Sequence, residues 1–160
     1  MTIVVRPAEL EDAQGIAQVH VQGWKEAYAH LVPAESLARL SVEQRELRWR
    51  ELLRGASATI WVAVDGGRIV GFARSAPSRE ADGPRDLELP EIYVLASHYG
   101  TGAGQKLIEA AFGDRPAYLW VADDNPRARA FYSRNGFQPD GTTKIGPVAG
   151  TEILEARLVR

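Results

Sequence analysis

The chain of 160 residues contains no cysteine, a single methionine and no large excess of charge of either sign. The absence of cysteine excludes a disulfide framework, a thiol nucleophile and a zinc finger, and with three scattered histidines we expect no bound metal. Lysine and arginine number 19 against 21 acidic residues, which gives a net charge of -2. Because a general nucleic-acid-binding protein usually shows a clustered basic excess, we expect no nucleic-acid partner.

Long hydrophobic runs are also missing. No stretch approaches the roughly 18 apolar residues of a membrane helix, and the opening residues lack the charged segment and apolar run of a leader. We therefore expect no membrane partner and a cytoplasmic location. The composition, 45% hydrophobic and 25% charged, is typical of a globular protein. Residues 1–160 are predicted to form one domain, since domains contain roughly 100–200 residues.

The first third of the chain is predicted to be one strand followed by helices. The β-branched residues 2–6 end at Pro7, which cannot donate a bond to a neighbouring strand. A second helical region over residues 34–54 is broken near Ser41, which could cap the next helix with Gln44 three residues on. Before it, a helix is predicted from large side chains that recur at four-residue spacing along one face; these are Ile16, His20, Trp24 and Tyr28.

Strands dominate the middle of the chain. Residues 58–64 and 68–75 flank Asp65-Gly66-Gly67, whose glycines permit the positive φ of a tight hairpin turn. A surface loop is predicted at residues 77–86, because two prolines, a glycine and five charges fall there. The next strand is predicted at residues 87–95, with a break or bulge at Pro90.

Beyond Tyr99 helices and strands alternate. The predicted elements are a helix over about 102–112, a strand at 117–121, a helix over about 125–135 that Gly136 ends, a strand from Phe137, and a last strand at 152–158. This order predicts an α/β domain around a mixed sheet, with a strand-helix-strand core.

A glycine-rich segment joins a strand to a helix at residues 99–104. Glycines at alternate positions let the backbone turn sharply and direct consecutive N–H groups into one concavity at a helix N-terminus, where the partial positive charge favours an anion. The segment therefore predicts a phosphate site, with a simple connecting turn as the competing interpretation. A nucleotide-binding domain is disfavoured, because the Gly-Lys-Ser/Thr of a Walker A loop is missing and a dinucleotide-binding loop would follow the first strand.

A more specific pattern lies at residues 119–137. The spacing Asn-x-x-Ala-x-x-Phe-Tyr-x-x-x-Gly-Phe occurs in full, at Asn125, Ala128, Phe131, Tyr132, Gly136 and Phe137. In this pattern the sequence resembles the GNAT superfamily, the Gcn-related N-acetyltransferases. The glycine loop lies upstream, where that family has its acyl-CoA pyrophosphate loop, and the opening Val5-Arg6-Pro7-Ala8 is similar to the common family start. The resemblance spans nearly the whole chain.

The resemblance implies an α+β GNAT-like fold. Its mixed, mostly antiparallel sheet of about six or seven strands would be flanked by about four helices around a β-α-β acyl-CoA-binding core. It also implies an acyltransferase that moves an acetyl group from acetyl-CoA, its co-substrate, to a primary amine of a small molecule or peptide, by direct attack in a ternary complex. A homodimer is expected by base rate.

The resemblance also assigns contacts to CoA. The pantetheine arm and thioester carbonyl would lie against Ile92, Tyr93 and Val94, whose backbone groups could pair with the arm as an added strand would. Asn125 would bond the pantetheine amides, cap its helix, or do both. The pyrophosphate would lie at Tyr99, Gly100, Thr101, Gly102, Ala103 and Gly104. Because Tyr99 stands where the family usually has Arg or Gln, we expect weakened phosphate affinity without its loss.

Tyr132 is the candidate general acid, because the resemblance puts its hydroxyl near the CoA sulfur. Glu88 and Glu91 are the candidate bases on the strand before the loop, each with a solvated edge carboxylate as the competing interpretation. Alternation of strand side chains would put them on opposite faces unless Pro90 introduces a bulge, so we expect one to line the cleft. His20 is a third option, although a histidine on an apolar stripe is more often a core residue.

Trp24 and Tyr28 fall where the resemblance puts the helical wall of the acceptor pocket, although aromatics at helical spacing usually belong to the core. If they line the pocket, an aromatic wall would suit a cationic or apolar amine. The alternative function is a non-catalytic acyl-CoA-binding or sensing domain of the same fold. Retention of Tyr132 and of two strand glutamates favours the enzyme.

Overall fold

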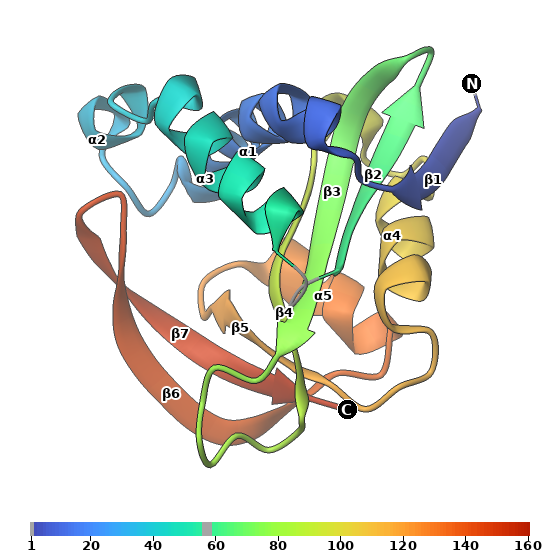
Figure 1. Ribbon diagram of the computed structural model, residues 1–160. Coiled ribbons are helices and arrows are strands. Elements are labelled where there is room, and N and C mark those ends of the chain that lie inside the picture. Colours follow the sequence, from blue (N-terminus) through green and yellow to red (C-terminus); the bar gives the residue numbers. More distant parts are fainter. Residues whose placement is uncertain (1, 56–58) are drawn as a thin grey trace.

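The computed structural model describes residues 2–55 and 59–160, which form one seven-stranded sheet (Figure 1). The strand order is β1-β2-β3-β4-β5-β7-β6, and neighbours run antiparallel except for the parallel pair β4 and β5. The strands are β1 (Ile3–Pro7), β2 (Thr59–Asp65), β3 (Arg68–Pro77), β4 (Leu87–Val94), β5 (Tyr118–Ala122), β6 (Gln138–Val148) and β7 (Thr151–Val159). The predicted mixed, mostly antiparallel sheet is present, although Ala58, the predicted start of β2, lies outside the described residues.

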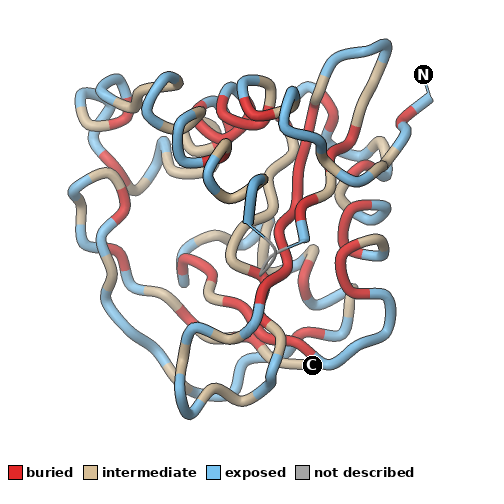
Figure 2. The backbone as a smooth tube through the Cα atoms, in the orientation of Figure 1, coloured by how far each residue is buried: buried red, intermediate tan, exposed pale blue. Residues whose placement is uncertain are grey.

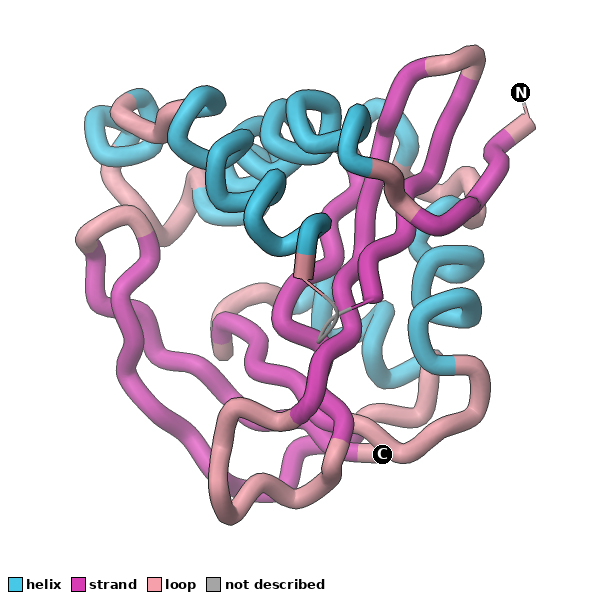
Figure 3. Tube along the Cα trace, viewed as in Figure 1, coloured by secondary structure: helices cyan, strands magenta, loops and turns pink. Residues whose placement is uncertain are grey.

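Helices cover both faces of the sheet (Figures 1 and 3). On one face lie α1 (Ala13–Tyr28), the short α2 (Ala34–Ala38) and α3 (Val42–Arg54), and on the other lie α4 (Ala103–Phe112) and α5 (Pro126–Arg134). Within the described ranges there are five α-helices where the resemblance implied about four, and the region 34–54 divides near Ser41 as predicted. The Ser41 hydroxyl accepts a hydrogen bond from the backbone N–H of Gln44 at 3.2 Å, which confirms the predicted cap.

The core fills the space between the sheet and its two helix layers (Figure 2). A second, smaller cluster lies beside the main one and joins the α1–α2 region to the hairpin of β6 and β7. Its buried members are Val32, Leu37, Ala122, Val148 and Ile153. Trp24 and Tyr28 pack against this cluster, so the end of α1 is tied to the far side of the sheet. In the part of the chain that is described, no helix is long and apolar enough to span a bilayer.

Strand β4 contains a bulge beside Pro90. Arg74 pairs with Glu91 and Ala76 pairs with Glu88, so β3 has one residue between these pairs where β4 has two. Directly paired side chains share a face of the sheet, and so do residues two apart on one strand. Glu88 and Glu91 therefore face the same side of the sheet, where regular alternation would have placed them on opposite sides.

Strands β4 and β5 meet at one point. Within the described residues, Glu88 with Tyr118 is the single ladder pair between them, whereas β5 pairs with β7 along its whole length. Beyond that pair, towards Val94 and Ala122, the two strands diverge and the sheet opens. This opening positions the candidate functional site.

Candidate active site

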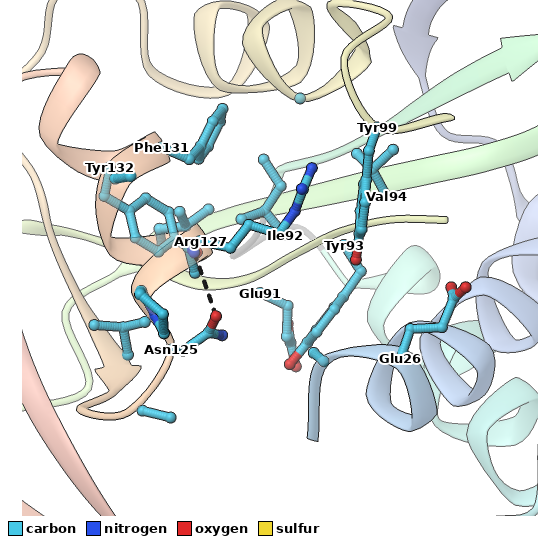
Figure 4. Close-up of a pocket in the computed structure, with 18 of the residues that line it drawn as sticks. Glu26, Glu91, Ile92, Tyr93, Val94, Tyr99, Asn125, Arg127, Phe131 and Tyr132 are labelled. Carbon is cyan, nitrogen blue, oxygen red and sulfur yellow. Dashed lines mark hydrogen bonds between the residues drawn. The ribbon is translucent and has the colours of Figure 1, made fainter. Parts of the chain in front are cut away.

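A cavity of about 770 Å³ occupies the opening between β4 and β5. Residues 89–94 of β4 form one wall, residues 120–122 of β5 and the start of α5 form the opposite wall, and the glycine loop before α4 lies at one end. Figure 4 shows Asn125, Arg127 and Tyr132 of the α5 region facing Ile92 and Val94 of β4. The structure thus brings together the two segments that the sequence singled out.

The wall formed by β4 offers free backbone groups. On one edge, β4 pairs with β3 as far as Val94. On the other edge, the described structure has no pair between β4 and β5 after Glu88, so the backbone groups there have no strand partner. An extended ligand arm lying in the cavity could pair with the free edge at Ile92, Tyr93 and Val94 as an additional strand would.

The glycine loop turns through two glycines with positive φ. Gly100 and Gly102 have φ of +77° and +88°, a backbone conformation that residues with a side chain rarely adopt. A Cβ built at either position would have no atom within 4 Å. Gly104 has another role: its Cβ would lie 3.2 Å from Phe131 Cε1, so its small size lets α4 approach α5. Thr101 is not part of the cavity wall, and its hydroxyl donates to the carbonyl of His98 at 2.7 Å, which closes the turn.

A positively charged side chain lies against Tyr99 at this loop. The Arg127 guanidinium lies 3.4 Å from the centre of the Tyr99 ring, and both residues line the cavity. Arg127 comes from the first turn of α5, after Asn125, whose side chain caps the helix by accepting from the N–H of Ala128 at 3.3 Å. Sequence reasoning missed Arg127, although its place inside the Asn motif was a signal.

Besides Tyr99, three tyrosines line the cavity, namely Tyr28, Tyr93 and Tyr132. Burial raises the pKa of Tyr132 well above its ordinary value, and the nearby Tyr28 raises it further. Burial also raises the pKa of Tyr93, to which Tyr28, Tyr132 and Glu91 contribute. All three hydroxyls therefore stay protonated at neutral pH and can act as hydrogen-bond donors.

The two candidate base residues have different surroundings. Glu91 lines the cavity, where its carboxylate accepts from Nε of Arg74 at 2.7 Å and lies 3.3 Å from an Nη of Arg48. Glu88 is 1% exposed and stands outside the cavity wall, at the point where β4 and β5 still pair. One of the two lines the cleft, as expected, but the cause is the divergence of the strands and not alternation along β4.

Glu88 is held in a polar network under the loop at residues 78–86. Its carboxylate accepts from Arg79 through the backbone and the side chain, and from the Tyr118 hydroxyl at 3.1 Å. The Tyr118 hydroxyl also lies 2.7 Å from that of Ser78. Burial by itself would raise the pKa of Glu88, but the bonds and charge of Arg79 outweigh burial and the pKa is lowered.

His20 and Trp24 lie outside the cavity wall. His20 is 1% exposed among four aromatic rings, and burial, followed by three nearby arginines, lowers its pKa to about 2. It is a neutral core residue. Trp24 packs edge-to-face on Tyr28, which does line the cavity, with 5.5 Å between the ring centres. Among the described residues no group of three or more His, Cys, Asp or Glu is placed to hold a metal ion.

Comparison with known proteins agrees with this geometry. The chain matches the family model described as the acetyltransferase (GNAT) domain over residues 56–139. The chain belongs to the GNAT acetyltransferase family. It is 35% identical over 165 residues to the uncharacterized N-acetyltransferase YuaI of Bacillus subtilis, an alignment that covers 98% of this chain and 91% of that relative.

Solved structures share the GNAT fold. The PaiA N-acetyltransferase from Thermoplasma acidophilum, in complex with coenzyme A, has a TM-score of 0.70 at 19% identity, with 98% of each chain covered. An N-acetyltransferase from Staphylococcus aureus has a TM-score of 0.75 at 19% identity, with 100% of this chain and 98% of that chain covered. The predicted α+β GNAT-like fold is confirmed, and the chain is an acyltransferase by family.

The position of Glu88 makes a prediction about stability. Because its folded-state pKa lies below the ordinary 4.5, ionised Glu88 stabilises the fold above about pH 4.5, and this contribution is lost as the pH falls through the folded-state pKa. Glu88→Gln should lower the free energy of unfolding at pH 7 by about 1–3 kcal/mol, a range that allows for the exposed Arg79 partner. The loss should shrink below about pH 4.5.

Urea unfolding followed by circular dichroism at neutral and acid pH measures both effects. Glu51→Gln, on the exposed side of α3, is the matched control and should change the free energy of unfolding by less than about 0.5 kcal/mol. A Glu88→Gln loss of the same size at pH 7 and pH 3 would show that the carboxylate charge is not what stabilises this site.

Proposed function

We propose that this GNAT protein is an acetyl-CoA-dependent N-acetyltransferase that acts on a primary amine of a small molecule or peptide. The observation that carries the proposal is the cavity between β4 and β5, which joins the glycine loop to Tyr132 and Glu91. Residues 1–160 would act as one domain. The cytoplasmic location and the homodimer stay predictions from the sequence.

The residues of the cavity fit CoA. The free edge of β4 at Ile92, Tyr93 and Val94 would pair with the pantetheine arm, whose amides Asn125 would also bond. The positive-φ glycines leave an open concavity for the pyrophosphate, and Arg127 supplies a guanidinium that the loop itself lacks at Tyr99. Bound acetyl-CoA supplies a thioester carbonyl that an amine can attack. Arg127 is thus the feature that offsets the departure at Tyr99.

Tyr132 would donate to the sulfur of the leaving thiolate. Burial keeps its hydroxyl protonated throughout the neutral and mildly alkaline range. As the general acid, Tyr132 would give its proton to the thiolate sulfur as the C–S bond breaks, while the proton lost by the amine goes to Glu91. Because a buried tyrosinate is costly, Tyr132 would then recover a proton from solvent.

Glu91 would accept the proton of the amine, directly or through a water molecule. Unlike Glu88, it borders the cavity, on the same side of the sheet as Tyr93. Its ion pairs with Arg74 and Arg48 fix the carboxylate in position. The direct ternary-complex reaction therefore assigns one residue to each end of the proton's path.

The first test concerns the glycine loop. Gly102→Asp places a negative charge in the cradle and should weaken CoA binding at least about tenfold, measured by calorimetric titration. Gly67→Asp is the matched control, because Gly67 in the β2–β3 hairpin has φ of +82° and equally open surroundings. Both variants should lose similar stability through backbone strain, about 1–2 kcal/mol. Equal CoA affinity in the two variants would remove the loop from the site.

The second test concerns Tyr132. Tyr132→Phe should keep CoA affinity and lower turnover by about 100-fold or more, within the range typical of general acid catalysis. Turnover is followed by release of free thiol. Because Tyr132 stays protonated, the wild-type rate should not fall between about pH 7 and pH 9. Tyr118→Phe removes a hydroxyl outside the cavity and should leave turnover unchanged; a Tyr132→Phe variant as active as this control would demote Tyr132 to packing.

The third test compares the two glutamates of β4. Glu91→Gln should slow turnover at least about tenfold, mostly at the lower end of the pH range, where the amine is protonated. Glu88→Gln has the same chemistry on the same strand and face, and should leave the pH–rate profile unchanged. Profiles that coincide for both variants and the wild type would mean that the amine enters deprotonated. Bound CoA without thiol release by the wild type, across a broad amine panel, would instead point to a sensing domain.

A further inference from the structure

Arginines gather on the side of the cavity that α3 covers. Arg45 and Arg48 come from α3 and Arg74 from β3, and Glu91 is the carboxylate that Arg48 and Arg74 share. We call these four residues the arginine cluster. It has a net charge of +2, since three guanidinium groups meet one carboxylate. Glu91 connects the cluster to the cavity, because it lines the cavity wall.

Arg45 has no carboxylate partner within 4.0 Å in the described part of the chain, although it is half-buried. Burial lowers the pKa of Arg45 and so does Arg48, whereas Tyr93 and Glu91, both in the cavity wall, raise it. A guanidinium withdrawn from water next to another guanidinium is unfavourable unless something negative lies near it.

The side-chain nitrogen that the Arg45 guanidinium contacts cannot accept a hydrogen bond from it. Its Nη1 lies 3.3 Å from Nε2 of His20, while Nδ1 of His20 lies 3.1 Å from the indole nitrogen of Trp49. Trp49 can only donate, so Nδ1 of the neutral His20 must accept and the ring proton sits on Nε2. Arg45 thus faces a second donor. Trp49 is fully buried and has no other hydrogen-bond partner among the described residues, so His20 accepts the hydrogen bond of its indole N–H. Donor groups of Arg45 are therefore left without an acceptor there.

The aromatic wall expected for a cationic amine already holds a cation of the protein. The Arg45 guanidinium lies 4.4 Å from the centre of the Trp24 ring. Trp24 packs on Tyr28, and Tyr28 lines the cavity. Neither Trp24 nor Arg45 lines the cavity itself, but together they place a positive charge next to its Tyr28 wall, which reverses the preference drawn from the aromatic residues alone.

We propose that the acceptor amine carries an anionic group, a carboxylate or a phosphate, that Arg45 and Arg48 bind while the amine lies at Glu91. This inference rests on the proposed function. Guanidinium groups bind both anions through paired, charge-assisted hydrogen bonds, and Arg48 is 44% exposed in its side chain, so it can turn to the ligand. The short distance of 3.3 Å between Arg48 and Glu91 suits a small acceptor whose amine and anion are close together.

The experiment uses matched pairs of amines on the full-length protein. Glycine and L-phenylalanine are compared with their amides, and O-phosphoethanolamine with ethanolamine, so that the carboxylate and the phosphate are tested separately. Binding to the CoA-loaded protein is measured by calorimetry, and turnover by release of free thiol. We expect the anionic member of at least one pair to bind at least about tenfold more tightly than its neutral partner, because one charge-assisted hydrogen bond is strong enough to produce that factor.

Variants then assign the preference to residues. Arg48→Gln, at an exposed position that should fold normally, and Arg45→Gln should each reduce the preference for the anion at least about fivefold, with the change in KM larger than the change in kcat. Arg45→Lys, which keeps the charge, should restore part of it. Arg50→Gln, on the same helix with its guanidinium paired to Glu46, is the control and should leave the preference unchanged.

The two readouts separate this inference from the proposed function. Selective, arginine-dependent binding of the anionic amines supports the inference even if no acetyl group is transferred. The absence of acetyl transfer would overturn only the proposed function. Equal binding of both members in every pair, or no binding of any amine, overturns the inference. A preference that survives both Arg45→Gln and Arg48→Gln also overturns it, whether or not turnover is seen.

Discussion

The separation of β4 from β5 is the constraint on which the rest of this structure depends. A parallel pair with a continuous ladder would close the sheet and leave no cavity. Here the ladder stops after Glu88 and Tyr118, and these two residues are also bonded to each other through their side chains. Arg79 neutralises the buried carboxylate at this closed end. The strands are thus held together at one end and free at the other.

Polar groups of several elements lie together at the free end, because those elements meet across the opening. Backbone groups of β4 have no neighbour there, the glycine loop turns into α4, and α5 brings Asn125 and Tyr132 from the other side. His30, beyond the end of α1, contacts the carbonyl of Asp124 at 2.6 Å, and so links the two sides of the opening. One gap in a sheet therefore brings a free strand edge and polar side chains together.

Aromatic rings around the cavity lie against cations of the protein itself. Arg127 covers Tyr99, Arg45 covers Trp24, and Lys144 lies 4.2 Å from the centre of the Trp120 ring. The rings reduce the cost of holding guanidinium and ammonium groups near a partly dry site. The result is positive charge both at the glycine loop and beside α3, in a protein whose net charge is -2.

Patterns that depend on neighbours in the chain could be predicted well. The hairpin at Gly66 and Gly67, the cap at Ser41 and the helix that Asn125 starts follow from local backbone chemistry. The Asn motif identified the family, because its fixed positions occur within one strand-turn-helix unit. The division of residues 34–54 near Ser41 was also predicted, and it gives the short α2, whose Leu37 is buried in the smaller cluster, and α3.

The sequence by itself determined the fold class, the family and the positions of the glycine loop and the Asn motif, since each depends on contiguous residues or fixed spacing. Only the tertiary structure decided which glutamate borders the cavity, that the bulge places both on one face, and that Arg127 stands beside Tyr99. It also decided that His20 serves Trp49 and leaves Arg45 without an acceptor. The hydrogen bonds behind these results join residues 17 to 30 positions apart in the chain. Packing and electrostatics act through space, whereas a sequence pattern records only the order along the chain, so these contacts could not be predicted from it.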